Sequence, residues 1–305
     1  MKHGSLLRSP RLRTHRYQYT RSVLFLLNDQ FAVWDSSSHG SFQTSLGALG
    51  ISQYKNPDQF FVPFVFYSIF QNTVTGILKH EKFIFQNYQY TDLAKERFIP
   101  TEDGGFVIFE NPLEAILFAL YFETYLREYN SDKSHNKIFE YLGPLKVRYG
   151  ICHDDVYMIK NQENYFGTGI INCARMMSKD KLDRCLIDES TYNWFLSHFN
   201  GLESLRHIPY DHLVTMKALK DLKAISDQKG YEYKSYAFPN RENKLEPGID
   251  VIMVMKVGTI KVKSNSISIY NLFMQMPYVY HNEEDKIINY VVASLGNNNA
   301  EGLID

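Results

Sequence analysis

Carboxylates in two predicted turns are the first residues of this sequence that could do chemistry. Asp103 lies in an Asp-Gly-Gly stretch, and Asp154 and Asp155 follow His153 after an apolar run. A turn carboxylate can bind a divalent metal ion, but Asp is also common in tight turns for conformational reasons alone. A histidine beside two carboxylates could act as a base, or it could simply be a solvent-exposed turn residue. The residue types leave both interpretations open.

The cysteines do not form a disulfide or metal pattern. There are three of them, Cys152, Cys173 and Cys185, and none belongs to a CxxC pair. An odd number without a Cys/His cluster argues against a disulfide framework and against a zinc site. Reduced thiols are typical of the cytoplasm, so we expect a cytoplasmic protein.

The composition is ordinary for a soluble globular protein, with 44% hydrophobic and 22% charged residues. A length of 305 residues allows one large domain, or a domain with a smaller appendage. The net charge of −1 gives no preference for nucleic acid or anionic lipid. The longest apolar run, residues 60–70, contains Pro63 and is too short to cross a bilayer. We therefore expect neither a nucleic-acid partner nor a membrane partner.

The elements that would position these turns alternate between strands and helices. Short apolar runs predict strands at 21–27, 31–34, 145–151, 156–159 and 185–187. Capping residues and longer apolar patterns predict helices over 65–80, from 112 onward, over 167–177 and over 188–199. The apolar arms around Asp103 predict a hairpin over 98–109. This order indicates an α+β fold, with helices packed on an antiparallel or mixed sheet.

The chain divides into three predicted parts. Residues 1–21 are basic and predict a flexible N-terminal tail, and residues 22–240 form the main domain. Residues 241–305 predict a small β-rich C-terminal domain, because 250–270 is dense in Val, Ile and Met.

Four segments, in this order, resemble motifs of the class III adenylate/guanylate cyclases. Thr101–Phe109 is similar to the Thr-Gly-Asp-Gly hairpin of that family, and Val147–His153 to its Val-Arg-Ile-Gly-Ile-His strand. Tyr165–Met176 is similar to its Gly…Asn-x-Ala-x-Arg-Met helix, and Cys185–Tyr192 to the strand and helix that follow. The resemblance implies the class III sandwich, a ferredoxin-like sheet with packed helices. It also implies conversion of a ribonucleoside triphosphate into a 3′,5′-cyclic nucleotide and pyrophosphate.

The resemblance implies two divalent metal ions, Mn²⁺ or Mg²⁺, held by two aspartates. Asp103 falls on the aspartate of the hairpin. The other aspartate belongs at the end of the first strand, and we assign it to Asp35, which follows the predicted strand 31–34 and precedes a loop of small residues. An alternative alignment takes Val23–Phe25 as the first strand and leaves Leu27 at the aspartate position.

The remaining catalytic positions match less completely. Arg175 falls on the arginine that stabilises the transition state of the family, and Lys217 faintly resembles its triphosphate-binding lysine. Ile171 stands where the family has its ribose-positioning Asn. Asn172 is one residue late, and one helical residue is a rotation of roughly 100°. We expect that Asn172 does not simply replace the family residue.

Base recognition differs from both purine cyclases. Ile99 and Asn164 occupy the positions at which adenylate cyclases have Lys and Asp and guanylate cyclases have Glu and Cys. This absence and the domain layout resemble the pyrimidine cyclases of bacterial Pycsar anti-phage systems. The resemblance implies UTP or CTP as substrate, a homodimer with shared sites, and a separate effector activated by the product. A purine cyclase with an unusual pocket, or an inactive cyclase fold that senses a nucleotide, are the alternatives.

Overall fold

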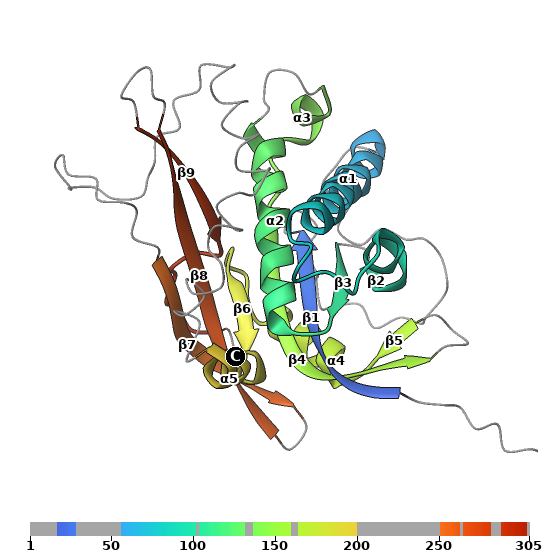
Figure 1. Ribbon diagram of the computed structural model, residues 1–305, viewed down its shortest axis with the longest axis vertical. Helices are drawn as coiled ribbons and strands as arrows, with labels where there is room; N and C mark the ends of the chain where they lie inside the picture. Colours follow the sequence, from blue (N-terminus) through green and yellow to red (C-terminus); the bar gives the residue numbers. More distant parts are fainter. Residues whose placement is uncertain are drawn as a thin grey trace, which may run out of the picture.

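The fold is known from a computed structural model that describes residues 17–28, 56–101, 104–131, 137–159, 164–199, 251–262, 265–281 and 288–303 (Figure 1). Asp35, Asp103, Lys217 and the predicted strand 31–34 lie outside these residues.

A six-element unit forms the centre of the structure. It consists of β1 (Tyr17–Asn28), α1 (Asn56–His80), β2 (Phe98–Thr101), β3 (Gly104–Phe109), α2 (Pro112–Ser131) and β4 (Val147–Ile159). Its strands lie in the order β4-β1-β3-β2, and every neighbouring pair is antiparallel. This is the β-α-β-β-α-β arrangement of ferredoxin-like folds. The predicted α+β fold with a ferredoxin-like sheet is confirmed.

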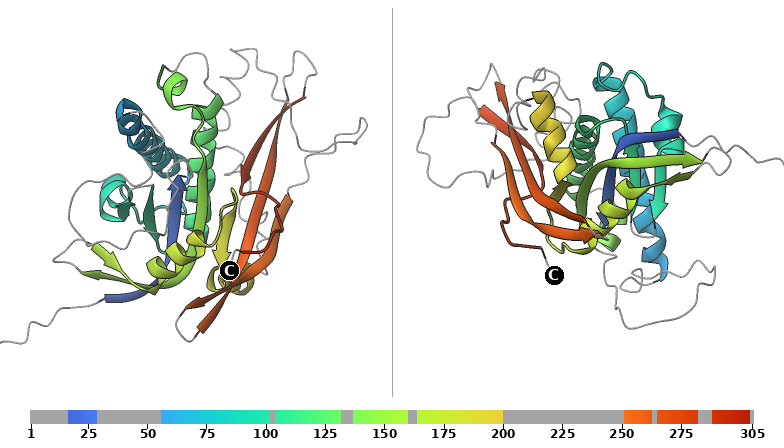
Figure 2. Two further views of the ribbon diagram at one scale, coloured as in Figure 1. Left: turned by 180° about the vertical axis from the view of Figure 1, so that it is seen from behind. Right: turned by 90° about the horizontal axis from the view of Figure 1, so that it is seen from below.

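The central strand β1 is buried on both faces, which explains why its sequence is continuously apolar rather than alternating. Leu24 and Leu26 face the side that α1 and α2 cover, whereas Val23, Phe25 and Leu27 face the opposite side. There they meet α4 (Thr168–Ser178), which Figure 2 shows from behind. The sheet is therefore a middle layer between helices.

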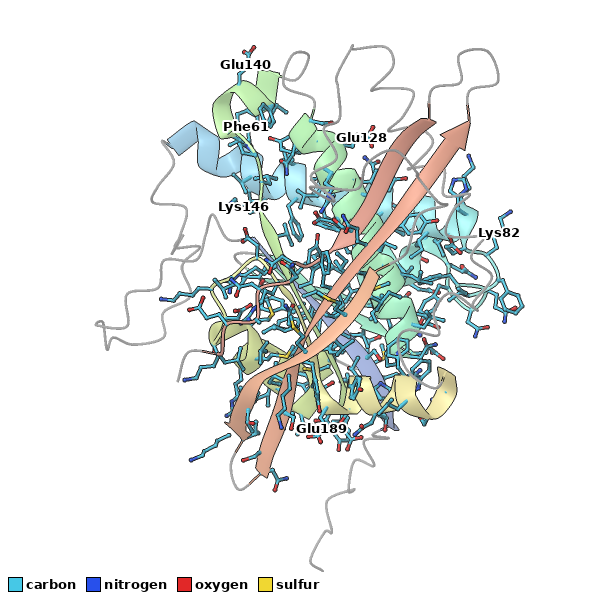
Figure 3. The ribbon with its side chains drawn as sticks, turned by 90° about the vertical axis from the view of Figure 1, so that its left-hand side faces the viewer. Phe61, Lys82, Glu128, Glu140, Lys146 and Glu189 are labelled. Atoms are coloured by element: carbon cyan, nitrogen blue, oxygen red, sulfur yellow. The ribbon has the colours of Figure 1, made fainter. Side chains whose placement is uncertain are left out.

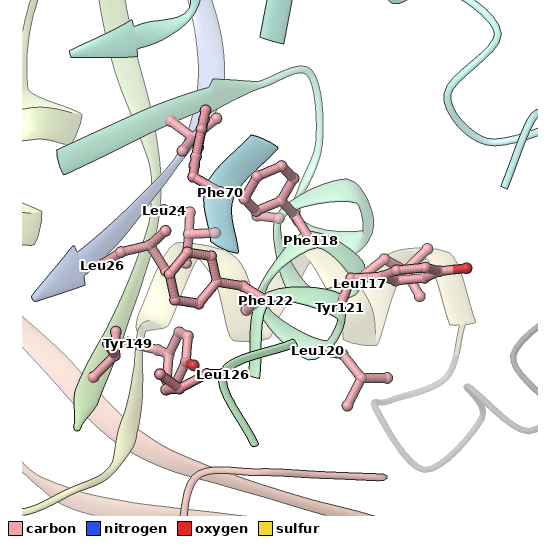
Figure 4. Packing of buried hydrophobic residues seen from close by; sticks show 14 of the residues in the cluster. Leu24, Leu26, Phe70, Leu117, Phe118, Leu120, Tyr121, Phe122, Leu126 and Tyr149 are labelled. Atoms are coloured by element: carbon pink, nitrogen blue, oxygen red, sulfur yellow. The ribbon is translucent and has the colours of Figure 1, made fainter. Parts of the chain in front are cut away.

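Aromatic residues fill the layer between β1 and the two long helices. Phe70 of α1 and Phe118 and Phe122 of α2 are fully buried and pack against Leu24 and Leu26 (Figure 4). The ring centroids of Phe70 and Phe118 lie 5.5 Å apart. The helix α1 begins at Asn56, nine residues before the predicted start at 65, and it includes Pro63.

The remaining elements extend the sheet and cover its ends. They are η3, a short π-helix (Asp92–Glu96), α3 (Lys137–Leu142), β5 (Asn164–Phe166), β6 (Cys185–Asp188), α5 (Glu189–Phe199), β7 (Val251–Val262), β8 (Asn265–His281) and β9 (Ile288–Leu295). The predicted hairpin over 98–109 and the helices that begin near 112, 168 and 189 are confirmed.

The turn predicted at 153–155 is not present. Residues 147–159 form one strand, and β1 pairs with it throughout, with Arg21 opposite Asp154 and Thr20 opposite Asp155. The polar residues stay in the strand because β1 supplies a continuous hydrogen-bonding partner. His153 is consequently a half-buried strand residue and not an exposed turn residue.

The C-terminal strands are β-rich, as expected, but they continue the same sheet. β6 lies parallel to β4, and β8 pairs with β6, placing Asn271 opposite Leu186. β7 and β9 then pair with β8. The described strands β7, β8 and β9 thus extend the main sheet. At the other end, β1 begins at Tyr17, inside the predicted tail 1–21.

One helix in the described part of the chain is long and apolar enough to cross a membrane by length and composition. It is the Phe61–His80 portion of α1, with a mean hydropathy of 1.3, and half of the window is buried inside the protein. Val62, Phe70 and Ile77 are fully buried in the core, as in the core helix of a soluble protein. Charged side chains such as Lys82, Glu140 and Lys146 lie at the periphery (Figure 3).

Candidate functional site

The hairpin that carries Asp103 is fixed at the end of β1. Thr101 of β2 pairs with Gly104 of β3, and Gly104 also lies opposite Leu27 of β1. A β-carbon at Gly104 would overlap the backbone oxygen of Leu26, so only glycine allows this close approach of the two strands. Asp103 itself lies outside the described residues.

Besides β2, the strand that pairs with β3 is β1, which contains Val23–Phe25, the first strand of the alternative alignment. Leu27 stands opposite Gly104, and its side chain is 7% exposed on the α4 face. No cluster of three or more His, Cys, Asp or Glu side chains capable of holding a metal occurs among the described residues. The described end of β1 therefore supplies an apolar side chain where two metal ions would need a carboxylate. Asp35 stays a prediction, without a described strand leading to it.

The wall next to Leu27 is apolar and aromatic. The rings of Phe25 and Phe106 stack with centroids 4.2 Å apart and planes 10° apart. Ile99 pairs with Phe106 across the β2–β3 hairpin and packs against the same buried cluster. Ile99 is thus on the face of the sheet that carries α4, at the hairpin end, and it offers no hydrogen-bonding group. Asn164 pairs with Ile159 through its backbone in β5, and its side chain lies outside the described residues.

The α4 helix is entered through a glycine that the fold requires. Gly167 has a φ of 153°, and a β-carbon there would overlap the backbone oxygen of Asp155. One turn later Ile171 is 49% exposed, and Arg175, four residues further, is also exposed in the last turn. Residues four apart share one helix face. Arg175 therefore stands on the outer face of α4, with Ile171 and not an amide beside it.

Asn172 points the other way. It is 4% exposed, and its Nδ2 donates a hydrogen bond of 2.9 Å to Oδ2 of Asp154 on β4. Its Oδ1 is buried without a hydrogen-bond partner. The rotation expected from the one-residue offset is thus present: Asn172 is buried against β4, whereas Ile171 and Arg175 are exposed. The catalytic roles of Asn172 and Arg175 stay predictions.

His153 lies on the opposite face of β4, with two partners that sequence reasoning missed, Ser22 and Asp188. His153 accepts or donates through Nδ1 to Oγ of Ser22 at 2.9 Å, and its backbone N–H donates to Oδ1 of Asp188 at 3.2 Å. Burial raises the pKa of Asp188 to about 6. Burial also lowers the pKa of His153, partly offset by the charge of Asp154. Only the capping position of Asp188 before α5 was visible in the sequence; its burial depends on the sheet.

The comparisons with known proteins find similar structures but no assigned family. No protein-family model matches the chain, and no curated protein matches it. Among solved structures, the adenylyl cyclase CyaB from P. aeruginosa is 13% identical over 89% of this chain and 98% of its own, with a TM-score of 0.40. The guanylyl cyclase Cya2 is 13% identical over 84% of this chain and 92% of its own, with a TM-score of 0.42.

A third similar structure is an adenylate/guanylate cyclase/hydrolase from Silicibacter pomeroyi. It is 11% identical over 84% of this chain and 97% of its own, with a TM-score of 0.37. Identities and TM-scores this low do not assign a family. The function has to be inferred from the residues and topology of the chain itself.

Proposed function

We propose that the protein is a nucleotidyl cyclase that forms a 3′,5′-cyclic nucleotide and pyrophosphate from a ribonucleoside triphosphate. The ribose 3′-oxygen would attack the α-phosphorus, the bond to the departing pyrophosphate would break, and the hydroxyl proton would leave to a base. The observation that supports this most is a shared location. Thr101 and Gly104, which flank Asp103 in the sequence, lie beside the end of β1, and α4 with its exposed Arg175 covers one face of that strand.

The proposed reaction requires two divalent metal ions. The proposed ligands, Asp103 and Asp35, both lie outside the described residues, and Leu27 occupies the place opposite Gly104. At the end of β1 beside Gly104, the described residues present Leu27 and not a carboxylate. When bound, two divalent ions would supply charge neutralisation for the triphosphate. Arg175 would add a cation, and Lys217 a further one.

The proposed substrate is a pyrimidine triphosphate, with UTP before CTP. A purine leaves several ring and exocyclic groups that cost about 1–3 kcal/mol each when buried without partners. Ile99 is half-buried against an aromatic wall and cannot satisfy them. The amide of Asn164 carries both a donor and an acceptor, which suits the single amide-like edge of uracil. We further propose a cytoplasmic homodimer whose product activates a separate effector in defence against phage.

A second candidate function is supported by a specific observation. Leu27 opposite Gly104 and Ile171 beside Arg175 each replace a polar group that the cyclase reaction uses. A chain with both changes could bind a nucleotide without converting it and act as a sensor.

One experiment separates the two functions. Purified protein is incubated with each of the four ribonucleoside triphosphates in the presence of Mn²⁺. The products are separated by chromatography and identified by mass spectrometry. A cyclic pyrimidine nucleotide together with pyrophosphate supports the cyclase. Saturable binding of a triphosphate in calorimetry, with no product, supports the sensor.

A further inference from the structure

Residues 296–303 form a segment without helix or strand that nevertheless follows one defined path. Gly296, at a φ of 69°, turns the chain away from β9, and a β-carbon there would lie 2.5 Å from the backbone oxygen of Leu272. At the far end the N–H of Leu303 donates to the backbone oxygen of Val257 at 3.0 Å. Leu303 packs against the same buried cluster as Met177. The segment therefore lies on the face of the sheet that α4 covers.

The fully buried Arg184 connects this segment to the end of α4. Its Nε and Nη2 donate to Oδ1 of Asp180 at 3.2 and 2.7 Å. Its Nη1 donates to the backbone oxygens of Asn299 and Glu301 at 3.2 and 2.5 Å. A buried guanidinium is tolerated only when its donors are paired. The carbonyl groups of the segment complete that pairing.

Asparagines fix the shape of the segment. The fully buried Asn271 of β8 donates through Nδ2 to the backbone oxygens of Asn297 and Asn299 at 2.8 and 3.0 Å. Asn297 Oδ1 accepts from the N–H of Asn299, and Asn299 Oδ1 accepts from the N–H of Glu301, each at 2.9 Å. Asn297 also donates to the backbone oxygen of Asp183. These side chains hold the carbonyl groups where Arg184 can reach them.

Asp180 connects the hydrogen bonds of Arg184 to the end of α4. Its N–H donates to the backbone oxygen of Met177 at 3.3 Å, and the buried Arg148 donates to the backbone oxygens of both residues. The last turn of α4 therefore ends in a network that includes the segment. Arg175 stands in that turn.

We infer that residues 296–303 are a strap that holds the C-terminal end of α4, so that releasing the strap loosens the helix that carries Arg175. The effect on the helix follows from the contacts alone. Any effect on catalysis by Arg175 rests on the proposed function.

The test uses the full chain with Asn297→Ala and Asn299→Ala together. This double variant removes the internal turns of the strap but leaves Arg184, Asp180 and Asn271 in place. Asn298→Ala is the matched control, because Asn298 is exposed between the two. Hydrogen–deuterium exchange is measured for the amides of 174–178 and, as an internal reference, for those of 115–126 in α2.

If the strap holds α4, hydrogen exchange of the amides at 174–178 should be about tenfold faster in the double variant. The reason is that losing a few hydrogen bonds makes local opening of the helix end easier. Exchange in α2 and in the control should not change. Unchanged exchange at 174–178, or an equal increase in α2, would overturn the inference. If the double variant does not fold, Asn297→Ala alone serves, with the same two readouts.

Measuring the enzymatic activity of the double variant tests the link to catalysis separately. If the protein is a cyclase, kcat should fall in the double variant while the KM for the triphosphate changes little. Because the exchange measurement needs no activity, an inactive protein would refute the proposed function without affecting the strap.

Discussion

At the scale of single residues, Asp188 is the ionisable side chain with the clearest structural role. It is 2% exposed, and its Oδ1 accepts hydrogen bonds from the N–H groups of Thr191 at 2.9 Å and His153 at 3.2 Å. Burial raises its pKa to about 6, against an ordinary value near 3.8. A carboxyl group with a raised pKa in the folded state binds a proton there before it does in the unfolded state. Its stabilising contribution is therefore present at low pH and is lost as the pH rises through about 6.

Asp188→Asn should remove this pH dependence, because Asn keeps an acceptor for both N–H groups but does not titrate. The free energy of unfolding of the wild type, minus that of the variant, should fall by about 2 kcal/mol between pH 4 and pH 7. Urea unfolding at a series of pH values measures it. Because the pKa of His153 is lowered, its contribution to the free energy of unfolding rises with pH. That contribution is common to both proteins and cancels in the difference. A difference that does not vary with pH would contradict the burial of an ionisable carboxyl.

The metal ligands are a second residue-scale prediction. Asp103→Ala and Asp35→Ala should each lower product formation by at least about 100-fold while leaving the unfolding transition unchanged. Glu140→Ala, which removes an exposed carboxylate elsewhere, should have no effect on the rate. Full activity in Asp35→Ala would show that Asp35 is not a ligand and that Leu27 stands at the aspartate position.

At the scale of elements, the start of α2 is set by reciprocal side-chain bonds. Oδ1 of Asn111 accepts from the N–H of Glu114 at 3.1 Å, and its Nδ2 donates to Oε1 of Glu114 at 2.8 Å. Oε2 of Glu114 accepts from the N–H of Glu110 at 2.9 Å and from the hydroxyl of Tyr88. Burial raises the pKa of Glu114, and these donors oppose that rise. The cap thus joins α2 to the residues before β2.

Asn111→Ala should lower the free energy of unfolding by about 1 kcal/mol, the usual loss for removing such a cap. Asn193→Ala, at an exposed position inside α5, is the control and should change it by less than about 0.5 kcal/mol. Chemical unfolding followed by circular dichroism measures both. An equal change in the free energy of unfolding for the two variants would show that the Asn111 cap does not stabilise the protein.

Local signals predicted the elements well where a residue type determines the backbone. The glycines of the 103–105 turn, the Asn111 cap and Gly167 mark the hairpin, α2 and α4 where the structure has them. The pairing of β8 with β6 was not predictable in this way, because Leu186 and Asn271 meet only in the folded sheet. For the same reason, the sequence suggested a turn at His153, where β1 in fact stabilises a strand.

The candidate site was predictable only in part. The sequence placed Arg175 on a helix and showed that Asn172 would be rotated from the position of the family's ribose-positioning Asn, and the buried bond from Asn172 to Asp154 agrees. The choice between Asp35 and Leu27 required knowing which strand lies beside the hairpin. That is a question of long-range register, which the pattern of residues does not contain.

At the scale of the whole molecule, the proposed homodimer would bring Asp103 of one subunit to Arg175 of the other. Mixing inactive Asp103→Ala with inactive Arg175→Ala should then restore activity to about a quarter of the wild type. Half of the randomly formed dimers are mixed, and each mixed dimer has one of its two sites intact. Rates are measured after mass spectrometry has verified the mixed species. Mixed dimers without activity would contradict shared sites.

The central claim is that this fold cyclises a nucleoside triphosphate and prefers a pyrimidine. The most direct measurement is a competition in which the protein receives equal concentrations of ATP, GTP, UTP and CTP with Mn²⁺, and every cyclic product is quantified by mass spectrometry. We predict cyclic UMP as the main product, with cyclic CMP next, and pyrophosphate in equal amount. Predominant cyclic AMP or cyclic GMP would contradict the pyrimidine preference, and no cyclic product at all would contradict the cyclase itself.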